Sequence, residues 1–153
     1  PGILPAEFNQ CPLFKMQMTV QTRRLHPLVS AQSLQELQGQ LWIGPSMSRN
    51  VITHLFTTQG LEVPPRIIEC ASYTLAINLM RRMDILGLFC SNLFENPFTS
   101  EGMQVLSLRE TFPWVDVSVV TLRNSRLTPT AQCLIDCLRS QPLPAGMLQA
   151  SNP

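Results

Sequence analysis

Two segments of the chain place small hydroxyl side chains between a predicted strand and a predicted helix. Residues 44–48 read GPSMS and residues 70–74 read CASYT, and each segment follows a short apolar run. Ligands of open α/β sheets bind at the carboxyl ends of strands, and the N–H groups of a helix N-terminus favour anions. The same serines could instead be ordinary helix caps. The residues predicted to contact a small anion are Pro45, Ser46, Met47, Ser48, Ala71 and Ser72.

The chain carries no convincing constellation for catalysis. Residues 44–48 are similar to the G-x-S-x-G turn of hydrolases, but Ser48 stands where the last glycine should be. Both histidines, His26 and His54, precede Asp84, so the order of acid and histidine does not fit such an enzyme. Neither a glycine-rich phosphate loop nor a pair of carboxylates stands out. The sequence therefore predicts no catalytic residue, no cofactor and no enzyme.

The cysteines suggest neither a metal site nor a disulfide framework. There are five of them, widely scattered, without a C-x-x-C motif and without a histidine at ligand spacing. We expect small buried hydrophobic residues, with redox sensing as the alternative, and reduced thiols suit the cytoplasm. The five are Cys11, Cys70, Cys90, Cys133 and Cys137.

Composition limits what the chain can bind by itself. Of its 153 residues, 44% are apolar, and 11 basic residues against 10 acidic ones leave a net charge of +1. This argues against unaided binding to DNA or to an anionic membrane, because phosphate binding needs clustered excess Lys and Arg. Arg23-Arg24 and Arg81-Arg82 form short basic doublets. A solvated face explains these doublets best, although Arg23, at a strand end, could reach an anion.

Periodicity indicates strands that alternate with helices, flanked by a loop at residues 1–12 and a frayed tail from residue 141. This order is typical of an α/β fold with a mostly parallel sheet and helices on both faces. Thr128 and Pro129 open the last helix, whose inward side chains should be Ala131, Leu134, Ile135 and Leu138. We expect strands at 13–22, 40–44, 66–70, 85–90, 105–108 and 115–122, with helices at 33–38, from 48 to Gly60, at 72–84 and at 129–139.

An ordered set of weak motifs resembles the effector-binding domain of LysR-type transcriptional regulators. The motifs are PLF at 12–14, MTV at 18–20, RLHPL at 24–28, LQEL at 34–37 and QLWI at 40–43. Later segments that fit are IIEC at 67–70, SLRETFP at 107–113 and TPTA at 128–131. The resembling domains are longer, and this chain would lack the first half of lobe I, the helix-turn-helix and its linker helix.

The resemblance implies a periplasmic-binding-protein-like, two-lobed mixed sheet flanked by helices. Lobe II would span 12–111, lobe I would keep 1–11 and 112–140, and 141–153 would be a flexible tail. The chain would pass between the two lobes in the strands near 16–20 and 115–119, and these two segments would form the hinge. An organic anion bound between the lobes at the residues named above would alter a DNA-bound homodimer or tetramer.

The resemblance also implies a cytoplasmic regulator that meets DNA only through the missing helix-turn-helix and has no membrane partner. The alternative is a solute-binding protein of a transporter, which shares this fold.

Overall fold

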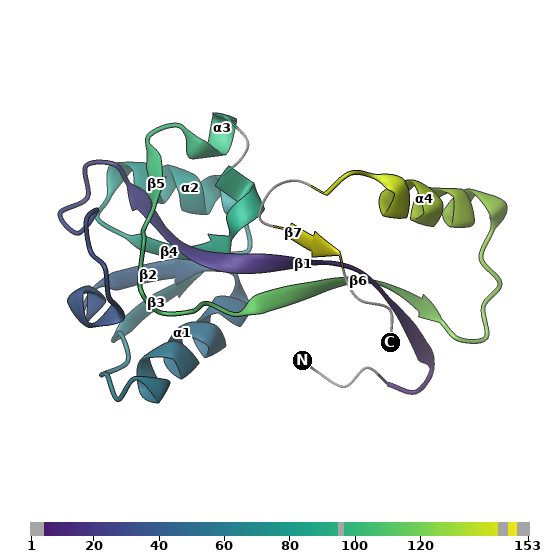
Figure 1. The fold of residues 1–153 in the computed structure, drawn as a ribbon, viewed down its shortest axis with the longest axis horizontal. Coiled ribbons are helices and arrows are strands. Elements are labelled where there is room, and N and C mark those ends of the chain that lie inside the picture. The colour runs from purple at the N-terminus through teal and green to yellow at the C-terminus, as the bar shows by residue number, and fades with distance from the viewer. Residues whose placement is uncertain (1–4, 95–96, 144–146, 150–153) are drawn as a thin grey trace. The chain divides into compact units, whose positions relative to one another are not determined.

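The computed structural model describes residues 5–94, 97–143 and 147–149 (Figure 1). The chain divides into two compact units, residues 17–113 and residues 1–16 with 114–153. The larger unit holds all the residues predicted to contact a ligand.

Three parallel strands form the centre of the larger unit. They are β2 (Leu41–Gly44), β3 (Arg66–Glu69) and β4 (Leu86–Cys90), in the spatial order β3-β2-β4. Helix α1 (Ser46–Thr58) connects β2 to β3, and α2 (Tyr73–Arg82) leads back across β2 to β4. Right-handed crossovers that run in opposite directions place their helices on opposite faces of the sheet. Figure 1 shows α1 and α2 on the two faces, as the sequence predicts.

Successive residues of β2 pack into the two halves of the core. Trp42 meets Phe56 of α1, with ring centroids 5.8 Å apart and the rings nearly perpendicular. Ile43 points to the other face, because side chains alternate along a strand. There it joins a buried cluster that includes residues of α2 and β4. That cluster comprises Ile43, Ala76, Met80, Ile85, Phe89 and Met103.

The sheet is mixed, as the resemblance implies, but the expectation from periodicity that it is mostly parallel is wrong. Strand β1 (Phe8–Arg23) runs antiparallel to β4 and to β5 (Met103–Val105). Alternation along β1 was readable in the sequence, but a period of two does not specify the direction of the neighbouring strand. Strand β5 also begins two residues before the predicted 105–108.

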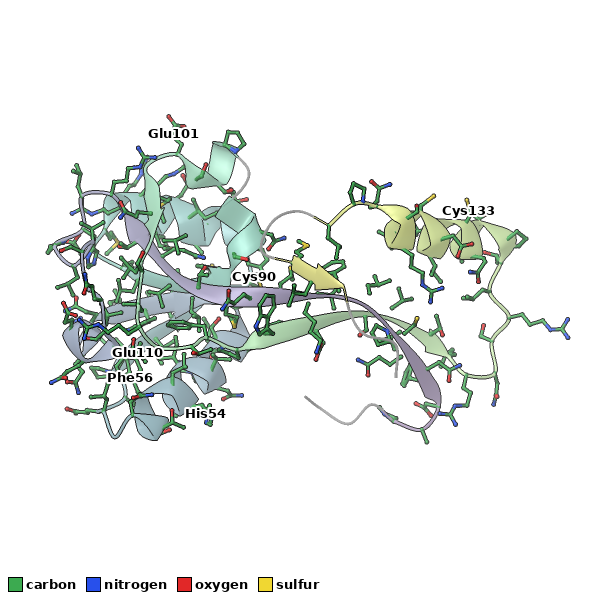
Figure 2. All side chains as sticks on the ribbon, viewed as in Figure 1. His54, Phe56, Cys90, Glu101, Glu110 and Cys133 are labelled. Carbon is green, nitrogen blue, oxygen red and sulfur yellow. The ribbon has the colours of Figure 1, made fainter. Side chains whose placement is uncertain are left out.

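Three short helical turns complete the larger unit. The helix predicted at 33–38 is a 3-10 turn, η1 (Leu34–Leu37). The other two turns are η2 (Ser91–Phe94) and α3 (Pro97–Ser100). Glu110, labelled in Figure 2, accepts a hydrogen bond from the Leu34 N–H at 2.9 Å. This distant carboxylate satisfies a donor that η1 itself leaves unpaired.

The smaller unit contains the first half of β1, β6 (Trp114–Leu122), β7 (Met147–Gln149) and α4 (Pro129–Ser140). Both β6 and β7 pair with β1. The expected loop at 1–12 is wrong from Phe8 onward, and part of the predicted flexible tail is a strand. Among the described residues, no helix is long and apolar enough to cross a bilayer.

Helix α4 begins where the sequence predicts but does not bury the expected face. The Thr128 hydroxyl accepts from the Ala131 N–H at 3.2 Å, and Pro129 follows it, which confirms the start signal. Leu134 is 61% exposed and Leu138 is 44% exposed, so the prediction that they point into a core is wrong for the described chain. Helical spacing identifies an apolar face, but it does not say which surface covers that face.

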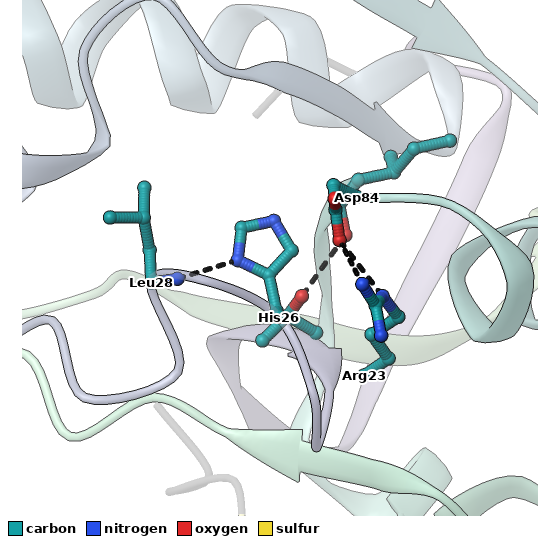
Figure 3. Close-up of polar contacts among 6 residues, drawn as sticks. Arg23, His26, Leu28 and Asp84 are labelled. Atoms are coloured by element: carbon teal, nitrogen blue, oxygen red, sulfur yellow. Dashed lines mark hydrogen bonds and ion pairs between the residues drawn. The ribbon is translucent and has the colours of Figure 1, made fainter.

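The turn after β1 buries His26, which is 3% exposed. The Leu28 N–H donates to His26 Nδ1 at 3.0 Å, which leaves the ring proton on Nε2 (Figure 3). Nε2 is buried and has no hydrogen-bond partner in the described structure. Burial lowers the pKa of His26; Asp84 opposes this shift and Arg23 adds to it.

This burial predicts an acid sensitivity of folding. The pKa of His26 lies below its ordinary value only in the folded state, so the unfolded chain binds the proton more tightly. The part of the free energy of unfolding that comes from the neutral, buried His26 ring is complete above about pH 6.5. It is lost as the pH falls toward the pKa of His26 in the folded state. His26→Asn should flatten the dependence of the free energy of unfolding on pH in this window, measured by urea titration. An identical pH slope in the parent chain and in His26→Asn would contradict this assignment.

Candidate functional site

The carboxyl ends of β2 and β3 lie side by side at one edge of the larger unit. The Cys70 N–H donates to the Gly44 carbonyl at 2.9 Å and holds the two strand ends together. Because α1 and α2 depart to opposite faces of the sheet, this edge is a topological switch point. Ligands of open α/β sheets bind at such points.

The first loop opens directly into α1. This helix begins at Ser46, two residues earlier than predicted, with Pro45 in the capping position. The Ser48 N–H donates to the Pro45 carbonyl at 2.8 Å. The N–H groups of Ser46 and Met47 precede the first possible intrahelical acceptor and can therefore meet a ligand. Ser46 is exposed and Met47 is 45% exposed, so both side chains are accessible.

Ser48 serves the packing of this loop. Its side chain is fully buried, and its hydroxyl donates to the Leu88 carbonyl of β4 at 3.0 Å. A Cβ at position 44 would come within 2.5 Å of the Ser48 hydroxyl oxygen and 3.0 Å of the Leu88 carbonyl oxygen. Only glycine at position 44 lets α1 begin this close to β4.

The second loop has the predicted cap. Ala71 and Ser72 are exposed, and the Ser72 hydroxyl accepts from the Leu75 N–H at 3.3 Å. Ser72 therefore starts α2 at the same edge as the start of α1. The structure thus brings both predicted segments together.

Two residues that the sequence interpretation missed border this edge. Tyr73, the only tyrosine of the chain, packs its ring against Phe89 with centroids 5.6 Å apart and remains 43% exposed. Cys90 ends β4 and is labelled in Figure 2. Burial raises the pKa of both groups, and the charge of Cys90 adds to the shift of Tyr73. Tyr73 could have been suspected because it directly follows the predicted cap.

The nearest cation on α1 is already engaged. Arg49 forms an ion pair with Glu69 and donates to the Ile67 carbonyl at 2.8 Å. The edge therefore offers backbone N–H groups, hydroxyls and apolar side chains. This set can bind and orient a small anion.

The cysteines differ from the expectation of five buried hydrophobic residues. All five are free, but Cys133 and Cys137 are exposed on α4 and the other three are only partly buried. Cys133 is labelled in Figure 2. Within the described residues, no three metal-ligating side chains gather. The periodicity of α4 could not predict this exposure, for the same reason that it misplaced Leu134.

Comparison with known proteins identifies the family of this chain. The model of the LysR substrate binding domain matches residues 1–142. The HTH-type transcriptional regulator GalR of Pseudomonas putida is 25% identical over 132 residues, which are 84% of this chain and 33% of GalR. The chain thus spans about a third of the length of this curated relative.

Solved structures agree on the fold. The regulatory domain of CcmR from Synechocystis PCC6803, in complex with 2-PG, has a TM-score of 0.69 at 19% identity, covering 90% of this chain and 69% of that one. The effector-binding domain of QuiR, in complex with shikimate, has a TM-score of 0.64 at 19% identity, covering 86% and 64%. The MetR regulatory domain from N. meningitidis has a TM-score of 0.71 at 10% identity, covering 99% and 75%. With the family model matched over most of its length, the chain belongs to the LysR substrate-binding domain family.

Proposed function

We propose that this chain is the ligand-sensing part of a bacterial LysR-type transcriptional regulator. The observation that carries the proposal is the pair of helix N-termini at one sheet edge, within a chain that matches the LysR substrate binding domain. The same match favours a regulator over a transporter's solute-binding protein. Similar proteins are regulatory domains, two of which were solved with 2-PG or shikimate, which supports a small-molecule effector and a role without turnover.

The two compact units correspond, in this proposal, to lobe II and the closing part of lobe I. The units divide at 16/17 and at 113/114. The proposed lobe boundaries at 12 and 111 and the hinge segments at 16–20 and 115–119 lie within a few residues of these divisions. Effector binding would act on the hinge and change the assembly of subunits on DNA. The full regulator would act in the cytoplasm as a homodimer or tetramer and contact DNA through a helix-turn-helix.

The effector site of the proposal uses Pro45, Ser46, Met47, Ser48, Ala71 and Ser72, each in a specific way. The N–H groups of Ser46 and Met47, together with the Ser46 hydroxyl, would hold a carboxylate or similar anion. The Met47 side chain would cover its apolar part. Ser72 would supply a hydroxyl beside its capping bond, and Ala71 and Pro45 would form the walls. Ser48 would act through the position of its backbone, since its hydroxyl is bonded to Leu88.

Titration of the isotope-labelled chain with organic acids tests the proposed effector site. Shikimate, benzoate and 2-PG are the probes, and amide NMR shifts of Ser46, Met47 and Tyr73 are the readout. We expect at least one probe to shift these amides saturably. Ser46→Ala should then weaken binding by about tenfold or more, because a charge-assisted hydrogen bond contributes about 1.5–3 kcal/mol.

The matched control is Ser125→Ala, an exposed serine outside this unit. It should bind the probe as the parent chain does. The assignment of the effector site is wrong if Ser46→Ala and Ser72→Ala both keep full affinity for the probe. The two serines would then serve only the starts of their helices.

A further inference from the structure

Tyr73 presents an aromatic ring at the sheet edge that carries the proposed effector site. It is the first residue of α2 and directly follows the Ser72 cap. Its ring contacts Phe89 of β4, with centroids 5.6 Å apart and ring planes inclined by 57°. The side chain nevertheless remains 43% exposed. A ligand bound at this edge can therefore reach the part of the ring that Phe89 does not cover.

The side chain behind Tyr73 is itself held in place. Phe89 is buried and belongs to the apolar cluster on the α2 side of the sheet. Its carbonyl accepts hydrogen bonds from the Thr19 hydroxyl and from the Gln21 side-chain amide of β1, each at 3.4 Å. Thr19 is also the cross-strand partner of Phe89. Because Phe89 fixes the Tyr73 ring beforehand, the ring loses little conformational freedom when a ligand binds.

Strand β4 connects the Tyr73 ring to the start of α1. The Leu88 carbonyl accepts from the Ser48 hydroxyl at 3.0 Å, and the next residue, Phe89, supports Tyr73. Strands β2 and β4 are neighbours in the sheet, and neighbouring strands lie about 4.8 Å apart. One small molecule can therefore meet the N–H groups at the start of α1 and the Tyr73 ring at the same time.

The two helices expose apolar side chains of different shape at this edge. Met47 on α1 is 45% exposed, and its flexible thioether chain adapts to many ligand shapes. The Tyr73 ring is flat, and aromatic rings prefer offset-stacked or edge-to-face contacts with one another. Of these two side chains, Tyr73 is the one that can distinguish a planar ring from a puckered one.

We propose that Tyr73 is a specificity-determining residue, which selects effectors that carry their acidic group on an aromatic ring. The inference rests on the proposed effector site and names the class of its ligand. The N–H groups of Ser46 and Met47 bind the carboxylate, and the ring of the ligand lies against the exposed part of Tyr73. Phe89 is a positioning residue, because it touches Tyr73 and not the ligand.

Benzoate and cyclohexanecarboxylate test this selectivity, because they carry the same carboxylate on a planar and on a puckered six-carbon ring. Amide shifts of Ser46 and Met47 give the two affinities. We expect the chain to bind benzoate about three- to tenfold more tightly. Tyr73 is the only tyrosine of the chain, so selective tyrosine labelling isolates its ring signals. Nuclear Overhauser effects between benzoate and these ring protons should report the contact directly.

Three variants separate the role of the Tyr73 ring from a general loss of structure. Tyr73→Leu keeps an apolar side chain without an aromatic ring, so the two acids should bind with about equal affinity. Tyr73→Phe keeps the ring and should retain the preference for benzoate. Leu75→Ala is the matched control, because Leu75 is exposed on the same helix but residues two apart do not face each other. Its preference for benzoate should match that of the parent chain.

Three results would overturn the inference and leave the effector site in place. The first is equal affinity of the parent chain for the two acids at Ser46 and Met47. The second is a preference for benzoate that survives in Tyr73→Leu. The third is binding of shikimate or 2-PG at these amides without binding of benzoate. Absence of saturable shifts with every one of these probes would instead reject the effector site itself, and the inference with it.

Discussion

Replacing Phe56 with alanine is expected to lower the free energy of unfolding by about 3–5 kcal/mol. Phe56 is fully buried and meets the Trp42 ring edge to face at 5.8 Å. The substitution removes the largest apolar side chain of α1 and leaves a cavity on one face of the central strands. Urea unfolding measures the loss, and the fluorescence of the buried Trp42 reports the local packing.

Leu75→Ala is the matched control for this prediction. Leu75 lies on α2, the helix on the other face, and is 54% exposed. Its loss should change stability by less than about 0.5 kcal/mol. A Phe56→Ala variant that loses less than about 1 kcal/mol would contradict the assignment of α1 to the core.

Gly44→Ala is expected to destabilise the larger unit by about 1–3 kcal/mol through overpacking. The added Cβ would meet the Ser48 Cβ at 2.7 Å and its hydroxyl oxygen at 2.5 Å, and would press on the Leu88 carbonyl oxygen at 3.0 Å. Relief requires α1 to move away from β4, so the N–H groups of Ser46 and Met47 would move too. We therefore expect weaker organic-acid binding together with the loss of stability.

A double-mutant cycle with Ser48→Ala checks the cause of this effect. Ser48→Ala alone removes the buried hydrogen bond to Leu88, at a cost of about 1–3 kcal/mol. The double variant should lose less than the sum of the two, because the closest clashing atom is gone. Ser46→Ala is the control on the same helix; its side chain is exposed, and stability should change by less than about 0.5 kcal/mol. Full additivity in the cycle would contradict the proposed contact between positions 44 and 48.

The central strands and helices could be predicted from the sequence because their signals are local. The runs at 41–44 and 66–69, the cap at Ser72 and the Thr128-Pro129 start all appear in the structure. Caps and periodicities depend on neighbours within a few residues, so sequence order is sufficient to identify them. The placement of both candidate loops at strand ends followed from the same signals.

Only the tertiary structure decided what the individual side chains do. The antiparallel pairing of β1, the exposure of Leu134 and the strand at 147–149 depend on which segments meet, and hydrophobic spacing does not contain that information. Ser46 and Ser48 look alike in the sequence, yet one is exposed at the site and the other is buried against Leu88. The difference arises because α1 begins at Ser46, two residues before the predicted start. The first turn of the helix thus directs Ser48 toward β4, where only glycine at position 44 leaves room for it.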